Sequence, residues 1–87
     1  MNVYHLGAID SGHPSWRISN EKNSVWACAP DAKAARDLVA AKTRVTAPDA
    51  DGVKTPWEDD AITSCVLDPT ISLMRAGTVV RMDGSVV

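Results

Sequence analysis

One well-marked amphipathic helix is the feature of this sequence that most constrains its fold. Asp31 is placed to cap the helix, because an aspartate carboxylate accepts the free backbone N–H groups of a first helical turn. Ala35, Leu38 and Val39 then recur at helical spacing and predict one buried face. The sequence therefore predicts a single helix over about Asp31–Thr43, packed on a small sheet.

Three strands are predicted before this helix. Val3–Ile9 alternates between two sets of side chains, which is the pattern of a strand with one face buried. Trp16–Ile18 is a short second strand, and Val25–Cys28 is an apolar third strand. Asn20–Asn23 has the composition of a loop, so the second and third strands are expected to form a hairpin.

Three more strands are predicted after the helix. Thr46–Asp60 contains two prolines, a glycine and five acids without periodicity, so a long loop leads to the strand Ala61–Leu67. The strands Thr78–Met82 and Ser85–Val87 form a hairpin, because Gly84 in its Asp-Gly pair readily takes a positive φ. The expected order βββ-α-βββ gives an α+β two-layer sandwich, in which one helix packs on a small antiparallel sheet.

Length and composition bound the possible classes of protein. A chain of 87 residues, 45% of them apolar, is expected to form one α+β domain over residues 1–87 rather than a disordered chain. A net charge of −2 argues against direct nucleic-acid binding, which needs a basic surface. No apolar run approaches the roughly 20 residues of a membrane span, and no signal peptide is visible. We expect a cytoplasmic protein.

The residues most often used in catalysis and metal binding are few. Cys28 and Cys65 fall in predicted strands, where a buried thiol is usually inert, and two cysteines are too few for a disulfide scaffold. His5 and His13 add no spacing that would suit zinc or a Cys–His nucleophile pair. The five glycines form no phosphate-binding motif. We expect a non-enzymatic protein without metal or cofactor, in which both thiols are unlinked.

The aromatic residues are three tryptophans and one tyrosine, with no phenylalanine. Because these rings carry a polar group, some are expected at a surface or an interface, and a homodimer is one interpretation. Trp16 and Trp26 lie on the two arms of the first predicted hairpin, where they either pair across the strands or pack in the core.

The segment between the helix and the next strand is acidic and holds the third tryptophan. Acidic side chains beside an exposed ring suit a basic protein partner, since charge steers the encounter and the indole anchors the complex. In the alternative interpretation the charges only solvate a loop, while Trp57 packs on the sheet. The candidate partner-binding residues are Asp49, Asp51, Trp57, Glu58, Asp59 and Asp60.

The first half of the chain resembles a class of small proteins in its pattern. Residues 1–45 combine a strand, a tryptophan hairpin and the segment Cys-Ala-Pro-Asp-Ala-Lys-Ala-Ala-Arg-Asp-Leu-Val-Ala-Ala. This order is similar to that of small phage and mobile-element proteins, among them anti-CRISPR proteins that inhibit type I surveillance complexes. The resemblance implies a non-enzymatic protein that binds a Cas subunit in the host cytoplasm, with an acidic surface turned to a basic DNA-binding channel.

Two functions follow as hypotheses. The first is a protein-binding module, most concretely an anti-CRISPR-like inhibitor that binds a Cas subunit and blocks DNA binding. The alternative is a self-associating structural or regulatory accessory protein of a phage or mobile element. The interface is expected either on the acidic segment or at the edge of the C-terminal hairpin.

Overall fold

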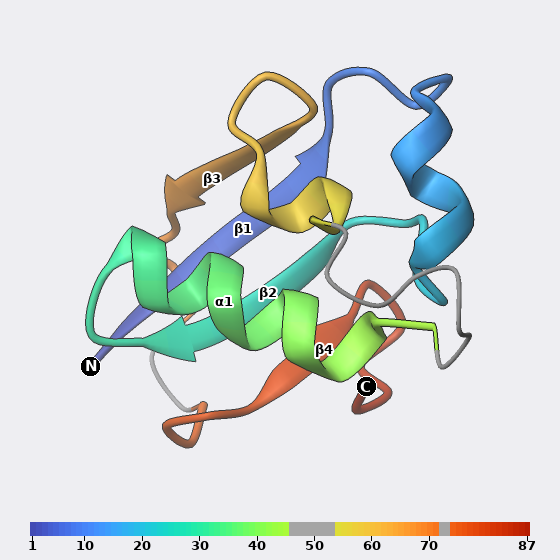
Figure 1. Cartoon of the computed structure of the whole chain (residues 1–87). Helices are drawn as coiled ribbons and strands as arrows, with labels where there is room; N and C mark the ends of the chain where they lie inside the picture. The colour runs from blue at the N-terminus through green and yellow to red at the C-terminus, as the bar shows by residue number, and fades with distance from the viewer. Residues whose placement is uncertain (46–53, 72–73) are drawn as a thin grey trace.

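Four strands form one antiparallel sheet, and the α-helix covers one of its faces (Figure 1). The computed structural model describes residues 1–45, 54–71 and 74–87. Across the sheet the strand order is β3-β1-β2-β4, so the two outer strands come last in the sequence. The predicted α+β class, with one helix on an antiparallel sheet, is confirmed. The strands are β1 (Asn2–Ala8), β2 (Val25–Ala29), β3 (Thr63–Leu67) and β4 (Val79–Arg81), and the helix is α1 (Ala32–Thr43).

The helix α1 forms where the sequence predicts it. Oδ1 of Asp31 accepts a hydrogen bond from the backbone N–H of Ala34 at 2.8 Å, so Asp31 is the N-cap. Ala35 and Val39 are fully buried, and Leu38 is partly buried against the same core. The predicted buried face is therefore confirmed, with Leu38 less buried than the other two residues.

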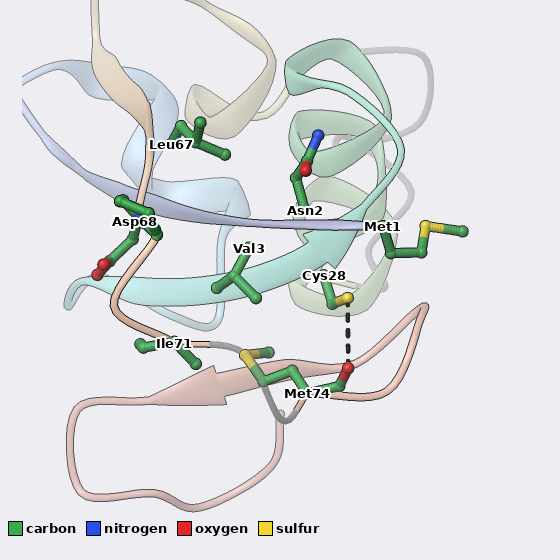
Figure 2. A pocket seen from close by; sticks show the side chains of 9 residues that line it. Met1, Asn2, Val3, Cys28, Leu67, Asp68, Ile71 and Met74 are labelled. Carbon is green, nitrogen blue, oxygen red and sulfur yellow. Dashed lines mark hydrogen bonds between the residues drawn. The ribbon is translucent and has the colours of Figure 1, made fainter.

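The strand β1 lies inside the sheet, with β2 on one side and β3 on the other. Successive side chains of a strand point to opposite faces, so one set packs under α1 and the other set points away from it. Leu6, Val25 and Val79 are fully buried on the α1 side. Ile71 and Met74, from the connection between β3 and β4, lie at one end of the opposite face, beside Val3 and Cys28 (Figure 2).

The predicted second strand at Trp16–Ile18 is wrong, because this segment belongs to the 3₁₀ helix η1 (Pro14–Ile18). Proline at its first position already has a helical φ. Nδ1 of His13 accepts the backbone N–H of Ser15 at 3.1 Å and caps the turn. Three residues that alternate in polarity fit a strand and a tight helical turn equally well, and the cap decides between them.

The three tryptophans occupy two different environments. Trp16 and Trp57 are buried and meet edge to face, with ring centroids 5.2 Å apart. The indole N–H of Trp16 donates to the carbonyl oxygen of Asp10 at 2.7 Å. Trp26 is half-buried on the face of the sheet away from α1. Of the two alternatives for these rings, pairing of Trp16 with Trp26 is wrong, and core packing is confirmed for Trp16.

The strand β3 begins two residues later than predicted, after the 3₁₀ helix η3 (Pro56–Glu58). The carbonyl oxygen of Asp59 accepts the backbone N–H groups of Ile62 at 3.1 Å and Thr63 at 3.0 Å. Ala61 and Ile62, which the sequence pattern assigns to the start of the strand, therefore lie in this turn. Part of the predicted loop before β3 is thus regular structure that packs against α1.

The predicted C-terminal hairpin is confirmed at its turn. Gly84 has a φ of +89°, and its N–H donates to the carbonyl oxygen of Arg81 at 3.0 Å. Beyond the turn, the N–H of Arg81 donates to the carbonyl oxygen of Ser85 at 2.8 Å, and Val80 forms a single bridge with Val86. The last residues are therefore a short return along the outer edge of β4 rather than the full strand that was predicted.

Candidate functional site

The face of the sheet that α1 leaves uncovered carries one continuous row of apolar and aromatic side chains. Residues that are partners in neighbouring strands share a face of the sheet. Here each member of the row is the partner of the next, from the β3 edge to the C-terminal return. The two end members expose 60% and 64% of their surface, and the members between them are half-buried. This open-face row consists of Val66, His5, Trp26, Val80 and Val86.

The centre of the open-face row is a stacked pair of rings. The imidazole of His5 and the indole of Trp26 have ring centroids 4.6 Å apart and an interplanar angle of 28°. The indole N–H donates to Oδ2 of Asp68 at 2.9 Å, so the polar edge of the ring has a partner within the chain. Trp26 is therefore fixed in orientation, as a preorganised anchor requires.

Asp68, which holds this indole, is itself held by the next residues of the chain. Its Oδ1 accepts the hydroxyl of Thr70 at 2.5 Å and the backbone N–H of Thr70 at 3.0 Å. The Thr70 hydroxyl and, after it, the indole N–H of Trp26 lower the pKa of Asp68, because each donor stabilises the carboxylate. The acceptor of the Trp26 hydrogen bond is thus ionised at neutral pH.

Acidification is expected to release Trp26 from Asp68. Since the pKa of Asp68 is lowered in the folded state, its hydrogen bonds contribute stability above the pKa of an unfolded aspartate, and this contribution is lost as the pH falls through the lower folded value. We expect a change in tryptophan emission below about pH 4, as Asp68 is protonated. Asp68→Asn should lack this transition. The same transition in the variant would show that another carboxyl group causes it.

A pocket of about 390 Å³ lies at one end of the open face (Figure 2). Val3 and Cys28 point into it from the sheet, and Ile71 and Met74 line it from the connection between β3 and β4. Cys28 is 3% exposed, and its thiol donates to the carbonyl oxygen of Met74 at 3.5 Å. A buried thiol that already donates a hydrogen bond within the chain favours packing rather than chemistry.

Short side chains lie on the other side of the open-face row. Gly7 is the partner of Ser64, and a Cβ atom at Gly7 would come within 3.2 Å of Oγ of Ser24. The hydroxyl of Ser64 donates to the carbonyl oxygen of Gly7 at 3.3 Å. The row therefore stands beside a strip of small residues, on which a partner can approach the backbone closely.

The acidic segment does not present its tryptophan to solvent. Trp57 is 0% exposed, and its indole N–H donates to Oγ of Ser19 at 3.0 Å. The prediction of Trp57 as an exposed anchor is therefore wrong, because the ring fills the core under η3. Of the alternative interpretation, the part in which Trp57 packs inside is confirmed. Asp49 and Asp51 lie outside the described residues.

Of the other three predicted partner-binding residues, Glu58 is the last residue of η3, and Asp59 and Asp60 follow it, on the α1 side of the sheet. Oε2 of Glu58 accepts the backbone N–H of Thr55 at 2.8 Å and lies 4.0 Å from Nη2 of Arg44. Oδ1 of Asp59 accepts a backbone N–H two residues further on, at 2.9 Å. Asp60 is exposed. Glu58 and Asp59 thus shape the local backbone, and none of the three lies on the open-face row.

The described residues contain no group of three or more His, Cys, Asp and Glu side chains that could hold a metal ion. Cys28 and Cys65 are both free, as predicted. Burial raises the pKa of the Cys65 thiol, although the nearby Arg36 guanidinium opposes this shift, so the thiol stays protonated and weakly nucleophilic. No helix in this part of the chain has the length and apolar character needed to cross a membrane.

Comparisons with known proteins assign no role to this face. No protein-family model, curated protein or solved structure matches the chain. The alternation in Val3–Ile9 indicates that His5 and Leu6 lie on opposite faces of the sheet. The sequence does not indicate which residues of β2 and β3 lie beside His5, so the open-face row was missed.

Proposed function

We propose that this chain is a non-enzymatic protein-binding module whose partner packs on the open-face row. The observation that carries this function is the sheet face opposite α1, with Trp26 fixed at its centre and exposed valines at both ends. Apolar and aromatic side chains that gather on one exposed face are typical of protein interfaces. A rigid indole in the middle of such a face is the kind of residue that carries much of the binding energy.

A partner with apolar side chains and a basic surface fits this chain best. Its apolar side chains would cover the open-face row, where Trp26 takes the anchoring role that the sequence pattern gives to Trp57. Its basic groups would be attracted by the net charge of −2 and by the acidic segment before β3. Exposed charges of this kind raise the association rate more than they strengthen the final complex. The steering residues are Asp49, Asp51, Glu58, Asp59 and Asp60.

The most concrete form of this function is an inhibitor of the anti-CRISPR type. It rests on the resemblance of residues 1–45 to small phage and mobile-element proteins. In this form the chain acts in the cytoplasm of the host cell, binds a Cas subunit of a type I surveillance complex and blocks DNA binding. The inhibitor itself makes no contact with nucleic acid, in keeping with its negative net charge.

Inhibition of DNA binding tests this function. Purified type I surveillance complexes are mixed with their target duplex, and the bound fraction is followed as the protein is added. We expect the wild type to lower the bound fraction. Val86→Lys places a charge at the exposed end of the row and should raise the inhibitory concentration about tenfold or more, since charge is depleted at interface cores. Ala41→Lys adds the same charge to an exposed site on α1 and should inhibit as the wild type does.

Two results would contradict separate parts of this function. If the folded wild type leaves DNA binding unchanged for every type I complex tested, the anti-CRISPR form is wrong. If Val86→Lys inhibits as strongly as Ala41→Lys, the open-face row is not the interface. Asp60→Lys separates steering from anchoring, because it should slow association at low salt and have little effect at high salt.

The second candidate function is a self-associating structural or regulatory accessory protein of a phage or mobile element. The observation that favours it is the outer edge of β3, which no other strand of the described residues covers. In this function the chain would build assemblies from its own copies instead of binding another protein. Light scattering separates the two functions, since ordered assemblies larger than a dimer support only the second.

A further inference from the structure

The strand β3 directs unpaired backbone groups out of the sheet. The N–H of Asp68 donates to the carbonyl oxygen of Val3 at 2.8 Å, which fixes the hydrogen-bonding phase between β3 and β1. In an antiparallel pair the direction of the backbone groups alternates along the strand. Val66 therefore faces β1, whereas Cys65 and Leu67 direct their N–H and C=O groups to the outside.

The open part of this edge is short and well defined. Thr63 also faces outward, but its N–H donates to the carbonyl oxygen of Asp59 at 3.0 Å and its carbonyl oxygen accepts Nη2 of Arg36 at 2.9 Å. Among the residues that the structure describes, none forms a hydrogen bond with the outward groups of Cys65 and Leu67. Two residues, each with one N–H and one C=O, leave four groups for a partner strand.

We propose that β3 pairs with β3 of a second copy of this chain, around a two-fold axis at Val66. In this antiparallel register Cys65 of each copy lies opposite Leu67 of the other. Each of these two pairs exchanges two hydrogen bonds, so all four outward groups of each copy are satisfied. This homodimer goes beyond the first proposed function, which concerns a different protein on the face of the sheet, and it specifies how the β3 edge named for the second function would pair.

Other antiparallel registers between the two copies of β3 would leave some of these outward N–H and C=O groups without a partner. An axis at Cys65 would place Leu67 opposite Thr63, whose outward groups are already bonded within the chain. An axis at Leu67 would place Cys65 opposite Pro69, which has no N–H to donate. The occupied groups at one end of β3 and the proline after its other end thus select the axis at Val66.

The side chains along β3 suit the same pairing. Val66 exposes 60% of its surface and Leu67 exposes 52%. Around the axis, Val66 meets its own copy in a position without hydrogen bonds, where opposing Cα atoms lie about 4.5 Å apart. The strand has no charged residue and no proline, which are the usual protections of an edge. Asp68 lies opposite Ser64 in this register, so no like charges meet.

The pairing makes one continuous sheet from the two copies. The open-face row of each copy ends at Val66, so the two rows join at the axis into a single line. The outer edge of β4 remains covered by the C-terminal return, where Val80 is bridged to Val86. Association therefore occurs through β3 and not through the C-terminal hairpin, the edge that the sequence suggests.

Sedimentation equilibrium of the full chain over a wide concentration range tests this dimer. We expect the wild-type mass to rise from monomer to dimer. Val66→Lys places two like charges opposite each other at the axis and should raise the dissociation constant about tenfold or more. Val86→Lys is the matched control, because this valine is 64% exposed at the other end of the row, and it should dimerise as the wild type does.

Two further variants keep the test independent of any one substitution. Leu67→Pro removes an outward N–H that has no partner within the chain, so it should weaken the dimer while circular dichroism stays that of the folded protein. Equal amounts of Val66→Lys and Val66→Glu should form a mixed dimer, although each alone is monomeric.

A wild type that stays monomeric, a dimer that survives both Val66→Lys and Leu67→Pro, or a dimer lost on adding reductant would overturn the proposal. Val86→Lys separates the two interfaces, since it should lose partner binding and keep the dimer.

Discussion

Replacement of Trp57 by Ala should lower the free energy of unfolding by about 3–5 kcal/mol. The ring is 0% exposed, it packs edge to face on Trp16, and its N–H donates to Oγ of Ser19. The substitution removes the largest fully buried side chain of the described residues and leaves a cavity under η3. A domain of this size has a total stability of about 4–13 kcal/mol, so the loss is a large share of it.

Urea unfolding followed by circular dichroism measures this loss. Trp26→Ala is the matched control, because it removes the same ring from the half-buried open face and should cost less. Trp57→Phe keeps most of the volume but loses the hydrogen bond to Ser19, so its midpoint should lie between those of the wild type and Trp57→Ala. Equal midpoints for Trp57→Ala and Trp26→Ala would show that Trp57 is not part of the core.

The second large effect is expected at Arg36, which ties α1 to η3 and β3. Its Nη1 donates to the carbonyl oxygen of Trp57 at 3.1 Å and to Oγ1 of Thr63 at 2.9 Å, and its Nη2 donates to the carbonyl oxygen of Thr63 at 2.9 Å. Arg36→Met keeps an apolar stem of similar length but removes these charged donors. We expect the free energy of unfolding to fall by about 1.5–3 kcal/mol.

Lys33→Met is the matched control for this variant. Lys33 lies on the same helix and pairs with Asp37 at 2.7 Å, but the two side chains are 86% and 53% exposed. An exposed pair of this kind contributes little, because water screens the charges and the long side chain loses conformational freedom. We expect no measurable change in the urea midpoint. Similar midpoints for the Arg36 and Lys33 variants would contradict the role assigned to Arg36.

The elements that depend only on residues close together in the sequence could be predicted from it. Asp31 caps α1, and Ala35 and Val39 form its buried stripe, because the cap and the helical spacing are local signals. The turn at Gly84 was equally accessible, since the Asp-Gly pair favours a positive φ whatever packs around it. In each case one short segment contains the whole physical cause of the structure.

The position of Trp57 shows where a local pattern misleads. Acidic residues follow this tryptophan and suggest solvent, yet the ring is the most deeply packed of the three. One local signal pointed the other way: Thr55 and Glu58 have the spacing of a capping box, with Pro56 at the first helical position. That signal predicts the turn η3, but the burial of the ring depends on Trp16, which is far away in the sequence.

The open-face row and the β3 edge could not be predicted for a different reason. Both depend on which strands are neighbours, and β1 pairs with β3 across a long separation in the sequence. A strand pattern states which side chains share a face, but it does not state the partner strand or the register. His5 and Val66 become members of one row only when that register is known.

Cross-saturation of valine and leucine methyl groups tests most directly whether the open-face row is the partner interface. The labelled chain is mixed with a purified type I surveillance complex, and saturation is transferred from the complex to methyl groups at the contact. We predict strong attenuation at Val66, Val80 and Val86, with no attenuation at Leu38 on α1. Attenuation confined to Leu38 and its neighbours, with the three valines unaffected, would place the interface on the helix layer and contradict the account.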